Sequence, residues 1–358
     1  MKTSTNTIIL LGLLAGSVQA QTTLGLYGIV DAGIVGERGG TASTTKVTSG
    51  AAAASRIGIK GNEELGDGMA AFFILESGVR IDTGELDAQN TLFNRQALVG
   101  LKTRVGSVTV GRQYTPWHAT LAAVADPFAT GYAGTSKNLF PDSGSNVRTS
   151  NTVMVASPVI GGVSADLAYS AGERSIDSAA GRQYGGSVGY AAGPLVVRLA
   201  YNNRNTDLPA VAGEAAAWAT GRNTLLAATY VVKGVKLHAG YGIDKGYNAA
   251  PIPNANNPFG GVKPTASTDG RSALLGATAP LGGGTLLFSV MHKDDKTAFN
   301  QDASAWGVGY LYHLSRRTGL YAAYAHVNNK NGAGYTVNNN SETGSGDTGY
   351  NLGLRHTF

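Results

Sequence analysis

Apolar and polar side chains alternate with a period of two along several segments of this chain. The clearest segment covers residues 235–244, where one face carries Val235, Leu237, Ala239, Tyr241 and Ile243. The other face carries Lys236, His238, Gly240, Gly242 and Asp244. The same alternation recurs at 163–170 and 195–202. Successive side chains of a β-strand point to opposite faces, so this period predicts strands with one apolar and one polar face.

Short and long connections alternate between the strands, and together they predict how many strands there are. Clusters that contain Gly or Pro mark seven short turns, near 64–68, 103–106, 158–162, 191–194, 233–234, 280–284 and 315–319. Eight longer connections centre on 36–50, 78–90, 115–147, 172–181, 205–220, 247–270, 294–304 and 328–347. These connections separate about sixteen strands, an even number typical of transmembrane antiparallel β-barrels. Alternation alone also fits a soluble sandwich, but the rhythm of the turns favours an all-β barrel with a polar lumen.

The first twenty residues have the features of an export signal. Lys2 supplies a positive charge, residues 8–16 form a short apolar core, and Val18-Gln19-Ala20 is a small-residue cleavage site. We therefore expect cleavage after Ala20, which leaves a single domain at 21–358. No run of twelve apolar residues follows, so the sequence predicts no helical membrane span.

Candidate catalytic and metal-binding residues are sparse. The chain has no cysteine, and its six histidines are scattered without the paired spacing of a zinc site. His292 with Asp294 and Asp295 fits a divalent cation, although a solvated strand end explains these residues better. No nucleophile elbow or phosphate-binding glycine loop is present, and the basic residues are dispersed rather than gathered into a patch. We therefore predict no enzyme activity, no cofactor, no metal and no nucleic-acid partner.

Several motifs give the chain a more specific likeness. They are Leu26-Tyr27-Gly28-Ile29-Val30-Asp31-Ala32-Gly33, the segments 55–61 and 63–66, Leu75-Glu76-Ser77-Gly78, the segment 93–101, Gly111-Arg112-Gln113-Tyr114-Thr115-Pro116, and the ending Arg355-His356-Thr357-Phe358. With these motifs the sequence resembles the Gram-negative general porins, particularly the betaproteobacterial group. The terminal Phe358 closes an alternating strand whose apolar face also carries Tyr350, Leu352 and Leu354. In this family such a residue serves as an assembly signal for the outer membrane.

The resemblance also implies a pore constriction. The third long loop, at about 115–147, is expected to fold into the barrel and to carry acidic residues that face arginines on the wall. By motif, Arg56, Arg95 and Arg148 match the wall arginines, and Asp126 matches an acidic position of the loop. The second loop acid is missing, because Ala129, Thr130 and Gly131 occupy that stretch. We therefore expect a constriction that is poorer in acid than is usual.

The residues themselves support part of this assignment. Arg56 shares a strand face with Lys60, while Ile57 and Ile59 take the opposite face, so alternation places both cations in the lumen. Arg95 is less clearly placed, because apolar residues share its face. Three further residues are secondary pore-lining candidates: Arg112, Glu76 and Asp142, of which Arg112 and Glu76 are candidates for a mutual ion pair.

Charge and resemblance together indicate a function. The chain carries 28 Lys and Arg against 23 Asp and Glu, a net charge of +5, and loss of Lys2 with the signal leaves +4. We expect an outer-membrane porin with moderate anion preference, through which small hydrophilic solutes and ions diffuse passively. The resemblance implies a homotrimer that contacts the lipid bilayer and lipopolysaccharide. Two alternatives remain open: a substrate-selective channel for an organic acid or another anion, and an adhesin or receptor barrel that acts through external loops such as 247–270.

Overall fold

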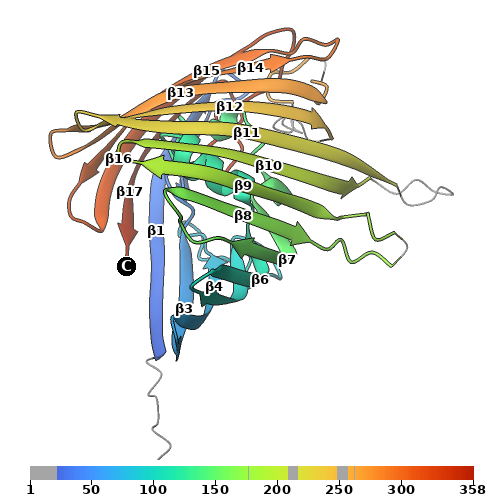
Figure 1. The fold of residues 1–358 in the computed structure, drawn as a ribbon. Coiled ribbons are helices and arrows are strands. Elements are labelled where there is room, and N and C mark those ends of the chain that lie inside the picture. Colours follow the sequence, from blue (N-terminus) through green and yellow to red (C-terminus); the bar gives the residue numbers. More distant parts are fainter. Residues whose placement is uncertain (1–21, 176, 209–216, 248–256, 262) are drawn as a thin grey trace, which may run out of the picture.

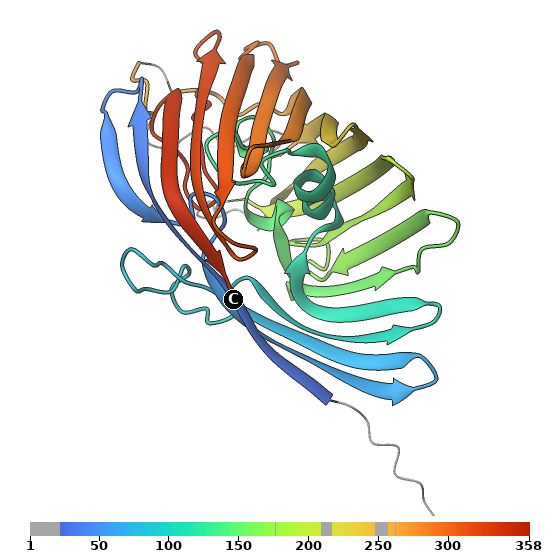
Figure 2. The same ribbon diagram turned by 90° about the vertical axis from the view of Figure 1, so that its left-hand side faces the viewer.

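The protein is an all-β barrel of antiparallel strands, as Figures 1 and 2 show. The computed structural model describes residues 22–175, 177–208, 217–247, 257–261 and 263–358. The predicted signal at 1–20 and its cleavage point lie outside the described residues. The strands are β1 (Thr22–Arg38), β2 (Thr44–Ser49), β3 (Arg56–Gly66), β4 (Met69–Gly78), β5 (Gln96–Thr103), β6 (Gly106–Tyr114), β7 (Arg148–Ala156), β8 (Val163–Ser170), β9 (Gln183–Ala192), β10 (Leu195–Asp207), β11 (Trp218–Val232), β12 (Val235–Gly246), β13 (Asp269–Leu281), β14 (Gly284–Asp295), β15 (Ala303–His313), β16 (Thr318–Asn329) and β17 (Thr348–Thr357).

Among the residues that the structure describes, helical structure is confined to short turns between β6 and β7. These are α1 (Pro116–Thr120), a π-helical turn η1 (Leu121–Ala125) and two 3-10 turns, η2 (Ser136–Asn138) and η3 (Gly144–Asn146). Across the described residues, no helix combines the length and the hydropathy that a membrane crossing requires.

The sheet closes on itself because the first and last strands pair. Residues 29–38 of β1 are in register with residues 357–348 of β17. On its other side, β1 pairs with β3 through residues 22–29 and with β2 through residues 32–37. The strands β2 and β3 therefore act as one barrel strand that is interrupted by the segment 50–55. The seventeen described strands thus fill sixteen positions around the ring, which confirms the predicted fold and strand count.

The connections follow the predicted rhythm. All seven short turns join the strands at one end of the barrel, and the long connections lie at the other end. The turn between β11 and β12 consists of Lys233 and Gly234, with φ values of 49° and 83°. Positive φ at both central residues matches the right-handed twist of the flanking strands, which explains such a tight hairpin. The long connections predicted at 205–220 and 247–270 are described only in part.

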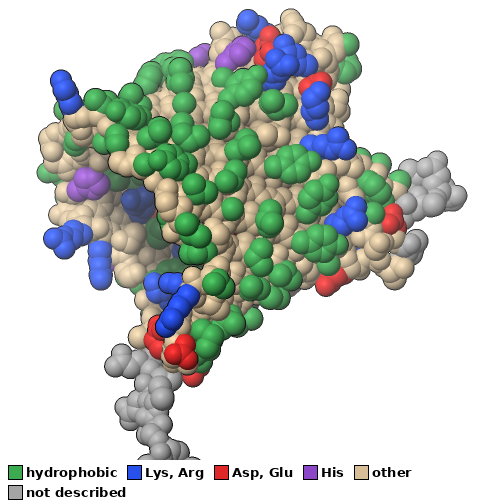
Figure 3. Space-filling model, viewed as in Figure 1, with side chains coloured by type: hydrophobic (Ala, Val, Ile, Leu, Met, Phe, Trp, Pro, Cys, Tyr) green, Lys and Arg blue, Asp and Glu red, His purple; other side chains and the backbone are tan. Residues whose placement is uncertain are grey.

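Strand alternation produces an apolar outer surface. On β12, Leu237, Tyr241 and Ile243 are 38–44% exposed, whereas His238 and Asp244 on the other face are 6% and 0% exposed. Hydrophobic side chains cover the outer wall of the barrel between its two ends (Figure 3). A surface of this kind is unstable in water and stable in a lipid bilayer. The predicted direction of the two faces, apolar outside and polar inside, is confirmed for this strand.

The carboxyl terminus takes part in closing the barrel. The backbone groups of Phe358 and Gly28 exchange two hydrogen bonds of 3.1 Å, one in each direction. The Phe358 ring lies over Gly28, where an added Cβ atom would stand only 2.4 Å from the ring. An aromatic ring that covers a glycine on the neighbouring strand shields the exposed backbone and fixes the register.

Replacing Phe358 with alanine should weaken this closure. A cross-strand aromatic contact contributes up to ~1 kcal/mol, so we expect the urea midpoint of the lipid-embedded protein to fall and the folded fraction after refolding to decrease. Phe358→Tyr keeps the ring and should behave like the unmodified chain. Equal stability of the alanine and tyrosine variants would contradict a closing role for the ring.

Candidate functional site

The long connection 115–147 lies inside the ring of strands, where its helical turns are visible in Figure 2. The side chain of Thr115 connects the beginning of this connection with its end. The Thr115 hydroxyl accepts a hydrogen bond from the backbone nitrogen of His118 at 3.1 Å, which caps α1, and donates one to the carbonyl of Asn146 at 2.5 Å. Pro116 at the first helical turn favours this start. We call residues 115–147 the inward loop.

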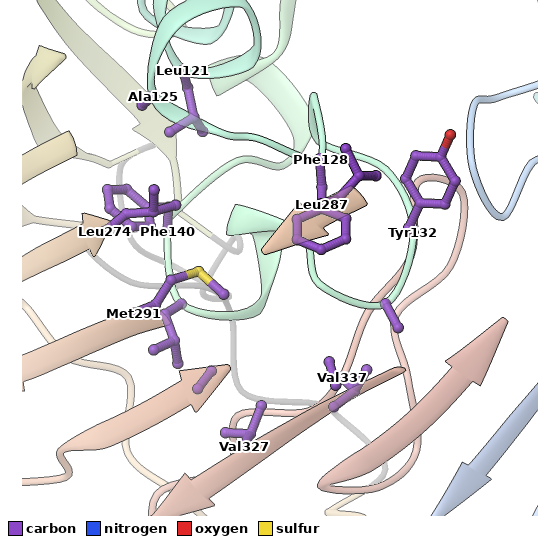
Figure 4. Packing of buried hydrophobic residues seen from close by; sticks show 14 of the residues in the cluster. Leu121, Ala125, Phe128, Tyr132, Phe140, Leu274, Leu287, Met291, Val327 and Val337 are labelled. Carbon is purple, nitrogen blue, oxygen red and sulfur yellow. The ribbon is translucent and has the colours of Figure 1, made fainter. Parts of the chain in front are cut away.

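Apolar packing holds the inward loop against one half of the wall. Trp117, Leu121, Phe128 and Phe140 of the loop are at most 1% exposed. They belong to one cluster with inward residues of β10 to β16, among them Ala200, Leu225, Leu274, Leu287, Met291 and Tyr321 (Figure 4). The sequence predicted a polar face toward the lumen, and for these apolar positions behind the loop the prediction is wrong. These positions are apolar because the loop, rather than water, covers them.

Small residues on this half of the wall let the loop approach closely. A Cβ atom added at Gly307 of β15 would lie 2.4 Å from the Cα atom of Gly134. At Gly276 of β13 it would lie 2.6 Å from the ring of Pro127. Any larger side chain at these two positions would push the loop away from the wall and into the open lumen.

A series of side-chain hydrogen bonds holds the C-terminal end of the inward loop against the wall. The Asn146 side chain donates to Asn223 of β11 at 3.1 Å and accepts from Asn202 of β10 at 3.0 Å. Asn223 donates in turn to Asp244 at 2.8 Å, and Lys293 donates to the other oxygen of Asp244 at 3.1 Å. These groups are buried and satisfy one another, which gives the chain of contacts a defined geometry.

Asp126 has a different position from the one expected. Its carboxylate is 2% exposed and accepts hydrogen bonds from the backbone nitrogens of Phe128, Thr130 and Ser136 at 2.8, 3.0 and 2.8 Å. Burial raises the pKa of Asp126 in spite of these bonds. The residue braces a turn inside the loop and does not line the open space, so the expectation that it faces the wall arginines is wrong.

The three predicted wall arginines converge on a tyrosine and a glutamate. Arg95 Nε lies 2.7 Å from Glu76 Oε1, and Arg56 Nη1 lies 3.9 Å from the same oxygen. The Tyr114 hydroxyl accepts from Arg95 at 2.7 Å and from Arg148 at 2.9 Å. The Arg148 guanidinium also stacks over the Tyr114 ring at 4.5 Å. Glu76 and Tyr114 thus hold together three cations that would otherwise repel one another.

The remaining basic candidates lie on either side of this group. Arg112 donates to the carbonyl of Asn94 at 2.6 Å and to Ser150 at 3.0 Å. It does not form the ion pair with Glu76 that the sequence left open, because Glu76 is taken by Arg95 and Arg56. Lys60 lies nearer the short-turn end, with its ammonium 5.4 Å from the centre of the Tyr27 ring, and does not line the main cavity.

Asp142 of the inward loop faces the wall arginines and is paired with His118. Its carboxylate lies 2.6 Å from Nδ1 of His118, whose ring stacks on Tyr114 at 5.1 Å. Burial by itself raises the pKa of Asp142, but His118, Lys137 and Arg148 outweigh burial and hold the pKa below its usual value. Asp142 is therefore a charged carboxylate at neutral pH.

Two further long connections contact the loop where it narrows the lumen. The backbone nitrogen of Tyr132 donates a hydrogen bond of 2.8 Å to the carbonyl of Ala51, in the segment 50–55 between β2 and β3. The Lys137 ammonium donates to the carbonyl of Asn340, in the connection before β17, at 2.6 Å. The Asn340 amide donates to the carbonyl of Thr130 at 2.9 Å. The aperture is therefore shaped by segments from the beginning, middle and end of the chain.

An open cavity of about 1150 Å³, the main cavity, lies between the inward loop and the arginines. Among the described residues that line it, six are cations: Arg56, Arg95, Arg112, Lys137, Arg148 and Arg355. Three are acids: Asp87, Asp142 and Glu342. Sequence reasoning missed four of these residues: Asp87, Lys137, Glu342 and Arg355. Strand alternation does place Arg355 on the inward face, whereas the positions of Lys137 and Glu342 depend on loop packing that has no sequence signal.

The chain is similar to known proteins over its whole length. A family model described as Gram-negative porin matches residues 7–332. The chain is 30% identical to outer membrane porin protein 32 of Delftia acidovorans, over 98% of this chain and 99% of that protein. It is 29% identical to an outer membrane porin protein of Bordetella pertussis, over 100% of both chains. Among solved structures it is similar to an anion-selective porin from Comamonas acidovorans, with a TM-score of 0.74 and 27% identity, over 94% of this chain and 100% of that chain.

Removing one apolar anchor should loosen the inward loop without opening the barrel. Phe128 is 1% exposed, and truncation of a buried Phe typically costs 3–5 kcal/mol, roughly, so Phe128→Ala should detach the loop from β15 and its neighbours. We expect faster trypsin cleavage after Lys137 and faster amide exchange over 121–140, with unchanged exchange in the strands. Phe299→Ala, at a residue that is 55% exposed, is the matched control. Unchanged cleavage in Phe128→Ala would show that other contacts are sufficient.

Proposed function

The chain belongs to the Gram-negative porin family, and from this premise we propose that it forms a water-filled channel in the outer membrane that favours small anions. Solutes cross by passive diffusion through the main cavity. The observation that carries the proposal is the charge of this cavity, whose described lining residues include six cations and three acids. No step of chemistry is needed, because the protein provides only a path and an electrostatic bias.

The size of that bias follows from Coulomb's law. One unit charge at ~10 Å in water contributes ~0.4 kcal/mol, which changes the ratio of monovalent anion to cation by about twofold. Arg95 contributes less than the other arginines, because it is 4% exposed and paired with Glu76. Salt screens the field over ~8 Å at physiological ionic strength, whereas the low-dielectric wall concentrates it. A moderate preference for anions results, in keeping with the anion-selective porin to which the chain is similar.

The proposal includes the surroundings of the barrel. Three copies pack side by side in the bilayer, each with its own channel, and the apolar outer wall contacts lipid or a neighbouring copy. The end that carries the long connections faces the exterior, where its charged side chains meet lipopolysaccharide. Residues 1–20 act as a signal that is cleaved on export, and Phe358 acts as the assembly signal for insertion.

Neutralising a wall arginine should reduce the preference for anions. In a KCl gradient across a planar bilayer, the unmodified channel should show a reversal potential on the chloride side. Arg148→Gln should lower the permeability ratio of chloride to potassium by about twofold, because one positive charge that lines the main cavity is lost. Arg271→Gln removes the same charge from the outer face of β13 and should have no such effect. A reversal potential on the potassium side in the unmodified protein would overturn the proposal.

Removing the carboxylate of the inward loop should change the permeability ratio of chloride to potassium in the opposite direction. Because Asp142 is charged at neutral pH, Asp142→Asn takes one negative charge from the main cavity and should raise the ratio of chloride to potassium permeability, by less than about twofold because Asp142 is buried and paired with His118. The same reversal-potential measurement checks this at neutral pH. Thermal or urea stability measured in parallel separates this effect from unfolding, since His118 loses its partner in the variant. A lower ratio in a stable variant would exclude Asp142 from the field in the pore.

A further inference from the structure

The outer wall of the barrel carries basic side chains at the end where the long connections lie. Arg222 of β11, Lys245 of β12 and Arg271 of β13 are exposed on the outward face of three neighbouring strands. Figure 3 shows Lys and Arg side chains along this margin of the apolar surface. None of the three lines the main cavity, so the passage of solutes gives them no role. We call these three residues the outer basic band.

The three residues of the outer basic band lie at the same depth on their strands. On each strand, five successive outward positions without a charge separate the basic residue from the short turn, over 224–232 in β11, 235–243 in β12 and 273–281 in β13. A tilted strand needs about nine residues to cross the hydrocarbon layer, which is the length of each run. The band therefore lies where the hydrocarbon ends and the head groups of the lipids begin.

Two cations of the band face each other directly. Arg222 and Lys245 are cross-strand partners in the ladder between β11 and β12. Like charges in this arrangement destabilise a sheet, because they repel at short range. Lys245 is partly balanced by its partner on β13, Asp269, at 3.4 Å. Arg222 has no such neighbour, so an external anion between the two cations would relieve the repulsion.

Arg271 also lacks a carboxylate of its own. The residue opposite it on β14 is Asp294, whose carboxylate lies 2.6 Å from the ammonium group of Lys296. Within the part of the chain that the structure describes, the guanidinium groups of Arg222 and Arg271 make no hydrogen bond or ion pair. Together with the ion pair between β12 and β13, four cations face two acids here, which leaves a net charge of +2.

An apolar groove with a volume of about 680 Å³ lies on the outer wall beside the band, over β7 to β10. Its lining is aliphatic and aromatic and includes Leu167 of β8 and Tyr201 of β10. Gly186 of β9 lies between these two residues in the ladders, and its missing side chain leaves the groove open. Tyr201 is the cross-strand partner of Thr224, the outward position next to Arg222, so the groove ends close to the band.

The band and the groove together define the ligand. Guanidinium and ammonium groups at the level of the head groups bind phosphate through charge-assisted hydrogen bonds, and an apolar groove in a bilayer accepts an acyl chain. Under the proposed function, this end of the barrel faces the exterior, where the anionic lipid is lipopolysaccharide.

We infer that the outer wall of β8 to β13 holds one lipopolysaccharide molecule per chain. The phosphates of its lipid A part lie on Arg222, Lys245 and Arg271, and one of its acyl chains occupies the groove. This inference rests on the proposed function, which supplies the orientation of the barrel, and it gives the contact with lipopolysaccharide a defined position.

Native mass spectrometry of the purified protein in a neutral detergent tests the inference. Titration with hexaacylated lipid A that carries two phosphates should show one tightly bound molecule per chain. The triple variant Arg222→Gln/Lys245→Gln/Arg271→Gln should raise the apparent Kd by about tenfold or more, because charged hydrogen bonds to phosphate are lost. Dephosphorylated lipid A should bind weakly, and equally to the variant and the unmodified protein.

Matched variants control for charge and for shape. Lys233→Gln/Arg316→Gln/Arg317→Gln removes the same charge from exposed positions at the short-turn end and should leave the Kd for lipid A unchanged. Ala165→Trp fills the groove from the outward face of β8 and should weaken binding. Ala277→Trp makes the same change on the outward face of β13, outside the groove, and should have no effect.

The results distinguish this inference from the channel function. Conductance in KCl, measured for every variant in planar bilayers, establishes that the barrels fold, and its absence in the unmodified protein would overturn the channel function. With normal conductance, equal binding of lipid A by the triple variant and the unmodified protein would overturn the inference. Two further results would also overturn it. Phosphatidylglycerol that binds as tightly as lipid A would indicate a general site for anionic lipids, and dissociation of the oligomer in the triple variant would indicate a contact between copies.

Discussion

Closure of the backbone hydrogen-bond ladder is the constraint on which the whole molecule depends. A peptide group without a partner is costly in hydrocarbon, and a sheet in a membrane therefore cannot have a free edge there. The pairing of residues 29–38 of β1 with β17 removes that edge and joins the two ends of the chain. Once the ring is closed, strand alternation determines which side chains meet lipid and which face the interior.

The interior is divided into two halves of opposite character. One half of the wall, from β10 to β16, carries the apolar cluster that serves as a platform for the inward loop, beside the buried polar groups that fix the end of the loop. The other half holds Arg56, Arg95 and Arg148, which Glu76 and Tyr114 keep at fixed positions. Because the platform holds the loop in place, the space between the loop and the arginines has a defined size and a defined electrostatic field. The selectivity of the channel thus depends on packing as much as on charge.

The sequence predicts the barrel well because its period-two pattern and turn residues are local. Strand count, the turn positions and the direction of Arg56 follow from spacing alone. Asp126 was misplaced, since a motif match cannot show whether a carboxylate faces the lumen or satisfies backbone groups of its own loop. Lys137 and Glu342 were missed for a related reason. Their positions depend on contacts between segments about 200 residues apart, such as the bond from Lys137 to Asn340, and these contacts have no periodic signature.

The contacts that join Ala51, Tyr132 and Asn340 have a consequence for assembly. Contacts between distant residues form only after the intervening chain has been organised, because closing long loops is entropically unfavourable. The last connection and β17 must therefore be in position before the loop can be fastened from both sides. The narrow part of the channel thus takes its final shape only when the last strand of the barrel is in place.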